Sequence, residues 1–164
     1  MQTFLPAKDF SICAQILDSK RLNKQILECY QILKVISNDD PFAGWRNHPA
    51  VKMWRGHEMV LLRYVTAMVN EADKRGIKTD KNKSNINALY EINKHWWSES
   101  YPLWYQNTET MKQVVATHRA NLFNKDPEYY ATFYIETISD YNKPCCDSCR
   151  YFWPTHTREF AHVA

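Results

Sequence analysis

Glycine is scarce in this chain of 164 residues, which contains only three. The glycines form neither G-x-G-x-x-G nor G-x-x-x-x-G-K-[ST], so the loops that bind dinucleotides or triphosphates are excluded. No apolar run approaches the roughly 18 residues of a membrane span. Without such a run we expect no membrane partner. The first residues, MQTFLPAKDF, lack the basic and apolar regions of a signal peptide. The motifs G-x-S-x-G and H-E-x-x-H are also missing, so we expect no serine-hydrolase or metalloprotease chemistry.

The five cysteines are an odd number without a secretion signal, so we expect no disulfide framework and a reduced, cytoplasmic protein. Cys13 and Cys29 lie among apolar residues and are expected in the core. One C-x-x-C pair supplies only half of a zinc site, so we expect no metal. A structural zinc ion in the tail stays open as an alternative, with the possible ligands Cys145, Cys146, Cys149 and His156.

Helical periodicity dominates the chain and strand-like alternation is nearly absent, which predicts an all-α fold. Hydrophobic residues make up 45% and charged residues 24%. This balance excludes wholesale disorder, and the length suits a single domain over residues 1–164. The lack of clear periodicity from about residue 140 predicts an irregular tail. About five helices are expected. They are a helix over 9–36 with a phase slip at 18–21, a helix from His48-Pro49 to Gly76, a helix capped by Ser84 after a polar loop at 74–83, a helix through Met111 and Leu122, and a short helix from Asp126-Pro127.

Four polar residues share one face of the first long helix, within about a quarter-turn to either side of one direction. They are Arg21, Lys24, Gln25 and Glu28. The face can be a solvated surface with an internal ion pair from Arg21 or Lys24 to Glu28. It can also be a cleft in which a carboxylate among cations receives an anionic substrate.

The stretch GWRNHPAVKMWRGHE, residues 44–58, crowds basic and aromatic residues around a helix start. Exposed N–H groups at that start, flanked by Arg46, Lys52 and Arg55, predict a phosphate site. Glu58 is in helical phase with apolar residues, so we expect it to be partly buried with a partner such as an arginine.

Residues 117–134 combine basic and aromatic side chains. Arg119 and Lys125 precede a dense aromatic segment, and cations with aromatic rings are typical of nucleic-acid contacts. The alternative is that these rings belong to the core. His118 lies on the apolar stripe, which favours a core histidine over a catalytic one.

The sequence resembles the pyrimidine-dimer DNA glycosylase family, in its broader phage and bacterial branch, in four blocks. They are TFLP, LDSKRLNKQILECYQIL, GWRNHPAVKMWRG and HRANLFNKDPEYY, which extend from Thr3 to about Tyr130. The resemblance implies a compact all-α enzyme that binds duplex DNA at cyclobutane pyrimidine dimers, kinks it and flips a nucleotide. It implies cleavage of a glycosidic bond and then β-elimination at the abasic site, without a metal or cofactor. The nucleophile would be the α-amine of the first residue, assisted by a glutamate on the first long helix.

The chain departs from the family pattern at its start. The best-known members begin with Met-Thr and lose the methionine, whereas Gln2 follows Met1 here. The bulk of Gln2 should block that removal, so we expect the α-amine of Met1 to be the nucleophile unless processing exposes Thr3. An α-amine has a pKa near 7.7–8.0, against about 10.4 for lysine, so its neutral fraction at pH 7 is roughly several hundred-fold larger.

A second departure concerns the catalytic glutamate. In the best-known members it directly follows an arginine, whereas Arg21 is followed by Leu22 here. We transfer its role to Glu28, two turns later on the face of Arg21, with Glu58 as the reserve.

The resemblance implies double-stranded DNA as the partner and no small-molecule cofactor, and we expect a monomer. The net charge of +3 is compatible with a polyanionic partner. The expected DNA-binding residues are Arg21, Lys24, Gln25, Arg46, His48, Arg55, Arg119 and Lys125. Two alternatives stay open, a non-catalytic DNA-binding module of the same fold and a glycosylase for another modified base.

Overall fold

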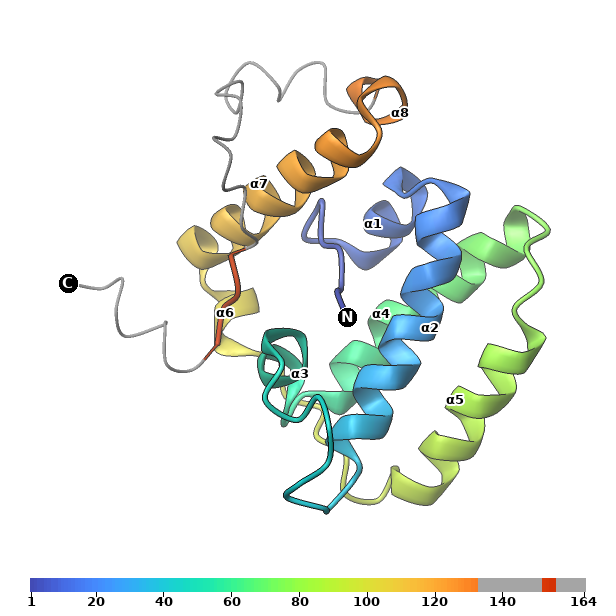
Figure 1. The fold of residues 1–164 in the computed structure, drawn as a ribbon, viewed down its shortest axis with the longest axis vertical. Coiled ribbons are helices and arrows are strands. Elements are labelled where there is room, and N and C mark those ends of the chain that lie inside the picture. Colours follow the sequence, from blue (N-terminus) through green and yellow to red (C-terminus); the bar gives the residue numbers. More distant parts are fainter. Residues whose placement is uncertain (133–151, 156–164) are drawn as a thin grey trace.

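The structure, a computed structural model, describes residues 1–132 and 152–155 (Figure 1). Within these residues the chain forms helices and no strand, which confirms the all-α prediction. The helices are α1 (Phe10–Ile16), α2 (Ser19–Ile36), α3 (Pro49–Trp54), α4 (Glu58–Lys74), α5 (Asp80–Asn93), α6 (Leu103–Gln106), α7 (Thr108–Lys125) and α8 (Pro127–Ala131). None of them is both long and apolar enough to cross a membrane.

Several helix boundaries lie where local sequence signals predicted them. The chain breaks between α1 and α2, and the Asp18 carboxylate accepts a hydrogen bond from the Arg21 amide at the start of α2, which explains the phase slip. His48 caps α3 ahead of Pro49, and Asp126 caps α8. These boundaries depend on side chains next to the helix end, so the sequence alone indicates them.

Two predicted boundaries are wrong. The helix expected from His48-Pro49 to Gly76 is interrupted after Trp54, where Gly56 adopts a left-handed φ of +81° that a continuous helix cannot contain. The helix expected to be capped by Ser84 begins earlier, at Asp80, so the polar loop is shorter than expected. α6 was not expected at all.

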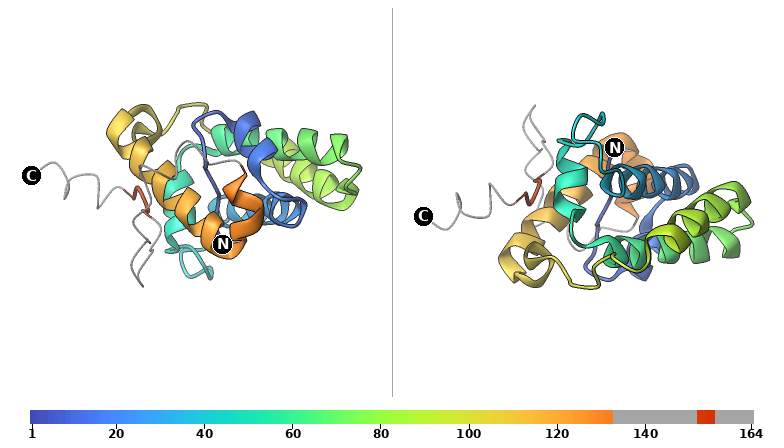
Figure 2. Two further views of the ribbon diagram at one scale, coloured as in Figure 1. Left: turned by 90° about the horizontal axis from the view of Figure 1, so that it is seen from above. Right: turned by 90° about the horizontal axis from the view of Figure 1, so that it is seen from below.

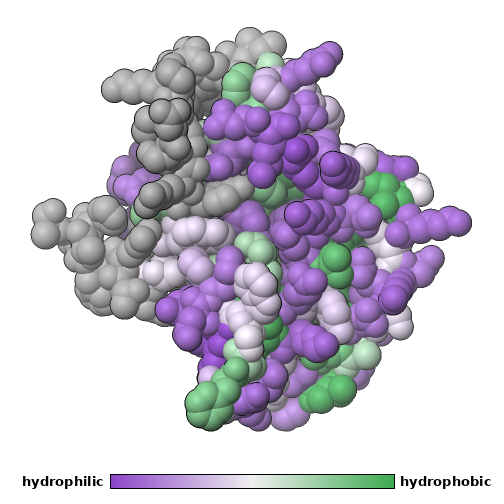
Figure 3. Space-filling view, in the orientation of Figure 1, coloured by the Kyte–Doolittle hydropathy of each residue, from purple (hydrophilic) through white to green (hydrophobic). Residues whose placement is uncertain are grey.

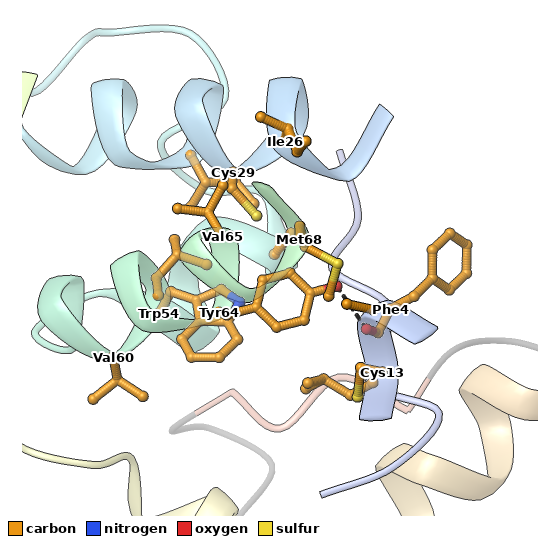
Figure 4. Packing of buried hydrophobic residues seen from close by; sticks show 14 of the residues in the cluster. Phe4, Cys13, Ile26, Cys29, Trp54, Val60, Tyr64, Val65 and Met68 are labelled. Atoms are coloured by element: carbon orange, nitrogen blue, oxygen red, sulfur yellow. Dashed lines mark hydrogen bonds between the residues drawn. The ribbon is translucent and has the colours of Figure 1, made fainter. Parts of the chain in front are cut away.

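The core forms mainly where α2 and α4 pack against each other, with α1 against α4 (Figure 1). Figure 4 shows Tyr64 of α4 between Trp54, Met68 and the N-terminal residue Phe4, all of them buried. Cys13 and Cys29 are fully buried there, as predicted, and burial raises the pKa of the Cys13 thiol to about 12. Both thiols are therefore neutral core side chains.

The chain begins at a partly exposed Met1, and the residues that follow are buried between the helices. Residues 1–6, which we call the N-terminal segment, lead into the middle of the helices (Figures 1 and 2). Thr3 and Leu5 are completely buried. Chain starts are usually poorly ordered unless they are tied down, so the order of this segment depends on its contacts with the helices.

Candidate active site

The N-terminal segment is held by side chains from four helices. The Phe4 amide donates to Oε1 of Gln25 on α2 (2.8 Å), and the Leu5 amide donates to Nδ1 of His118 on α7 (2.8 Å). The Thr3 hydroxyl accepts a hydrogen bond from Nε1 of Trp54 on α3 (2.9 Å). Tyr64 of α4 reaches the Phe4 carbonyl, the contact drawn in Figure 4. Residues 3–5 are thus fixed by contacts that are distant in sequence.

Glu28 is the carboxylate next to the chain start. It is 8% exposed, and its Oε2 accepts hydrogen bonds from the Gln2 amide (3.1 Å) and from Nε2 of Gln25 (3.2 Å). Its other oxygen lies 3.6 Å from Nζ of Lys24. Two donors and one cation therefore supply the partners that a buried carboxylate requires. Met1 directly precedes Gln2, whose amide is bonded to Glu28, and consecutive Cα atoms lie about 3.8 Å apart. The α-amine therefore belongs to the residue next to this contact.

Gln25 lies in a different place from the one expected. It was predicted to contact DNA, but its side chain is completely buried. Its Oε1 accepts from both the Phe4 amide and the Tyr64 hydroxyl, while its Nε2 donates to Glu28. Gln25 therefore links the N-terminal segment to the carboxylate, and no solvent-facing role is compatible with this position.

Met1 lines a cavity of about 510 Å³ beside the start of the chain. Lys34 of α2 and the loop residues Gly44 and Trp45 contribute to its wall. This volume lies in the range of pockets that hold small organic ligands, about 300–1,000 Å³. The cavity gives a substrate access to the first residue.

His48 lies near the α-amine. Burial lowers the pKa of its imidazole, and the positive charge of the chain's α-ammonium group lowers it further. Nδ1 accepts the amide proton of Ala50 at the start of α3 (3.1 Å), so the neutral ring carries its own proton on Nε2. His48 thus faces the site as an uncharged donor at neutral pH.

Arg46 and Arg55, the expected phosphate ligands, both hold the loop in front of α3. The Arg46 guanidinium donates to the Asn38 carbonyl (3.1 Å), and the Arg55 guanidinium donates to the Arg46 carbonyl (2.7 Å). Burial and the charge of Arg46 lower the pKa of Arg55. Sequence reasoning missed this role because it depends on backbone carbonyls that only the folded loop presents.

Of the other expected cations, two arginines bind groups of the protein and two lysines are exposed. Arg21 pairs with Asp18 (2.9 Å) and lies over the Tyr130 ring, and Arg119 donates to the Pro6 carbonyl (2.7 Å). Lys24 and Lys125 are exposed. The structure therefore brings Lys24, Glu28, His48 and Arg119 to the N-terminal segment, and it joins Arg21 to α8 instead.

Glu58, the reserve candidate, is 3% exposed at the start of α4. Its oxygens accept from the Gly56 amide (2.8 Å) and the Ser98 amide (3.0 Å). The partner expected for this buried carboxylate was an arginine, and two backbone amides take that place. Glu58 thereby ties the α3–α4 turn to residue 98.

A metal site has no support within the described residues, where no group of three or more His, Cys, Asp or Glu side chains could hold an ion. The tail residues considered for zinc are Cys145, Cys146, Cys149 and His156, and they lie outside the described part of the chain.

Comparison with known proteins gave one match. The sequence model of a family described as pyrimidine dimer DNA glycosylase matches residues 1–85 of the 164-residue chain. The matched span contains Met1, Glu28, His48 and Glu58, and it ends within α5. No curated protein and no solved structure matched the chain.

Proposed function

The chain belongs to the pyrimidine dimer DNA glycosylase family, so DNA is its substrate, and we propose that it excises cyclobutane pyrimidine dimers from duplex DNA and then cleaves the strand as an abasic-site lyase. The observation that carries the proposal is the contact between the Gln2 amide and Glu28, because it fixes the chain start against a buried carboxylate. We further propose that the protein is the phage or bacterial form of this enzyme, acts in the cytoplasm as a monomer, and needs no cofactor.

In the proposed first reaction, the neutral α-amine of Met1 attacks the sugar C1′. A nitrogen–carbon bond forms, the glycosidic bond breaks, and its electron pair leaves with the base. The amine then loses a proton and the sugar ring opens, which gives a Schiff base. The Glu28 carboxylate lies where it can stabilise positive charge developing at the sugar.

In the proposed second reaction, the Schiff base acts as an electron sink. A base removes a proton from C2′, and the electron pair expels the 3′ phosphate, which completes β-elimination. The Glu28 carboxylate accepts a hydrogen bond from the Gln2 amide, directly after residue 1, so we propose that Glu28 takes this proton. Glu58 is already bonded to two amides and ties a turn together, so we assign it a structural role.

Positioning supports this chemistry. Holding a nucleophile in an attack geometry can supply a large part of a rate enhancement. Here Gln25, His118 and Trp54 hold the three residues that follow Gln2. A freely moving chain start would lose that advantage.

For DNA binding, we propose that phosphates contact the cations around the N-terminal segment. Lys24 and Lys125 are exposed and can reach a phosphate directly. Arg46, His48, Arg55 and Arg119 are only partly exposed and already hold backbone groups, so we expect each to offer at most its remaining N–H donors. Arg21 is assigned the weakest contact because it pairs with Asp18.

Borohydride trapping tests the proposal. Wild-type protein is incubated with duplexes containing one cyclobutane dimer or one abasic site, and borohydride reduces any Schiff base to a stable link. We expect trapping on both duplexes and expect mass spectrometry to locate the DNA on the N-terminal peptide. A chain with an uncleaved N-terminal extension should bind DNA but not be trapped. Binding without trapping by the wild type would identify a non-catalytic module, and trapping on abasic DNA alone would point to another lesion.

A further inference from the structure

The loop between α2 and α3, residues 38–48, exposes two large aromatic side chains. Phe42 is 91% exposed and Trp45 is 62% exposed. Aromatic rings contribute strongly to stability when buried, so an exposed ring that lines a cavity suggests a binding surface, and of these two rings only that of Trp45 lines the cavity beside Met1. Hydrophobic surface projects in Figure 3 at the end of the molecule where this loop lies in Figure 1.

The backbone of the loop is strained at one of these residues. Trp45 has φ of +70°, and among the described residues no other non-glycine residue has a positive φ. This left-handed conformation is disfavoured for a residue with a large side chain. The guanidinium contacts from Arg46 to Asn38 and from Arg55 to Arg46 hold the backbone around it. The loop is thus fixed in a shape that presents the indole.

The indole lies beside the proposed nucleophile. Trp45 and Met1 line the same cavity of about 510 Å³. The Trp45 ring centroid is also 5.6 Å from that of His48, whose pKa is lowered partly by the α-ammonium group. A ligand that stacks on this ring would therefore occupy the cavity that Met1 also lines.

We propose that Trp45 stacks on an unstacked nucleobase at the lesion while the α-amine of Met1 reaches the sugar. The proposal rests on the glycosylase function proposed above. Enzymes that act on a base in duplex DNA take a nucleotide out of the helix, which removes the stacking of its base. An aromatic side chain restores a stacking partner, and any base suits it because every base has a flat π face. The base can come from the damaged strand or from the opposite strand.

Single-turnover kinetics with Trp45→Ala test the proposal. Stacking on one aromatic residue corresponds to about five- to 150-fold in affinity or rate. We expect a loss in this range on the dimer duplex, with Trp45→Phe restoring most of it. Phe42→Ala is the matched control from the same loop, because Phe42 does not line the cavity, and it should stay within about twofold of wild type. Thermal melting checks that all three variants fold.

The abasic duplex distinguishes the source of the base. If Trp45→Ala slows only the dimer reaction, the stacked base belongs to the damaged nucleotide, which the abasic duplex lacks. If it slows borohydride trapping on both duplexes, the base belongs to the opposite strand. Unchanged rates on both duplexes overturn the proposal, and so does a large loss in Phe42→Ala alone. Wild-type protein that is not trapped at all refutes the lyase function instead.

Photocrosslinking gives a readout that does not depend on catalysis. 5-Iodouracil is placed opposite the dimer in one duplex and beside it on the damaged strand in another, since irradiation links this base to aromatic rings that stack on it. We expect a crosslink to Trp45 in at least one duplex and its absence in Trp45→Ala. Where the kinetics assign the stacked base to the opposite strand, failure of the probe opposite the dimer to crosslink Trp45, with DNA binding intact, contradicts the stacking role.

Discussion

The N-terminal segment and the α2–α3 loop line the same cavity but are held in opposite ways. In the segment, Thr3 and Leu5 are completely buried, and side chains from other helices bind its amides. In the loop, Phe42 and Trp45 are exposed, and guanidinium groups bind its carbonyls. The difference separates two tasks. A nucleophile needs one fixed position, whereas a ring that stacks on a base has to be accessible, as Trp45 is.

The two regions also differ in how ordering is stabilised. Ordering a residue costs about 1–2 kcal/mol of backbone entropy at 25 °C. In the N-terminal segment, burial of Phe4 and Leu5 offsets this cost, because burying such a side chain stabilises by about 1.5–3 kcal/mol. In the loop, the rings of Phe42 and Trp45 are exposed and bury little apolar surface. The shape of the loop therefore depends on the hydrogen bonds of Arg46 and Arg55. Substitutions in the segment should therefore affect stability and catalysis together, whereas substitution of Trp45 in the loop should mainly affect the rate of the reaction on DNA.

The largest expected effect is that of Glu28→Gln. The substitution keeps the size of the side chain and removes the charge, so general acid–base and electrostatic assistance are lost. We expect the single-turnover rates of base excision and strand cleavage to fall by about 10²–10⁴-fold. Glu58→Gln is the control, and its main effect should be a lower melting temperature, because Glu58 accepts from two buried backbone amides. Full activity in Glu28→Gln with an inactive, folded Glu58→Gln would reverse the two assignments.

Gln25→Leu should break the link between the segment and the carboxylate. It removes the acceptor of the Phe4 amide and one of the two amide donors to the Glu28 carboxylate, and each unsatisfied buried group costs about 1–3 kcal/mol. We expect a lower free energy of unfolding in urea and a loss of trapping. Tyr64→Phe removes only the hydroxyl that contacts Gln25 and Phe4, so it should cost about 1 kcal/mol and keep trapping. Equal stability losses for the two variants would argue against a special role of Gln25.

Much of the fold could be predicted from the sequence, because helix periods and caps are local. The starts at Pro49 and Pro127 follow from the residues next to them. The break at Gly56 was missed because the left-handed turn is compatible with the sequence but is not required by it. Glu28 was found by its helical face, but its contact with Gln2 joins residues 26 positions apart.

Gln25 and Trp45 show why the rest of the site was harder to predict. Gln25 stands between Leu22 and Ile26 of the apolar stripe, a position that could have indicated burial. Its partner Phe4 is 21 residues away, and no local pattern identifies it. The conformation of Trp45 depends on the hydrogen bonds that Arg46 and Arg55 donate to backbone carbonyls. The sequence predicted these two arginines to be phosphate ligands.

His118 should make the stability of the protein depend on pH. Burial lowers the pKa of this histidine to about 3, against about 6.5 in the unfolded chain. Between these values the unfolded state binds one more proton, so the free energy of unfolding falls as pH is lowered, by at most about 1.4 kcal/mol per pH unit from this group. Urea unfolding between pH 6 and 4.5 measures the slope.

His118→Asn is the matched variant for this slope. Its side-chain oxygen can still accept the Leu5 amide at the position of Nδ1, but it does not titrate. We expect the slope between pH 6 and 4.5 to become shallower by up to about 1.4 kcal/mol per pH unit. An unchanged slope would mean that other groups, such as His48 with its lowered pKa, account for the acid sensitivity.

The smallest expected effect concerns the exposed cation closest to Glu28. Lys24 is exposed and lies 3.6 Å from the Glu28 carboxylate, so we expect it to neutralise one phosphate when DNA is bound. Lys24→Ala should then flatten the slope of log K against log salt by about 0.9, equally for undamaged and damaged duplexes. Lys83→Ala is the control, because Lys83 already pairs with Asp73 (2.7 Å) across α4 and α5. A flattened slope for Lys83→Ala beside an unaltered one for Lys24→Ala would move the DNA to the other side of the molecule, away from both the N-terminal segment and the α2–α3 loop.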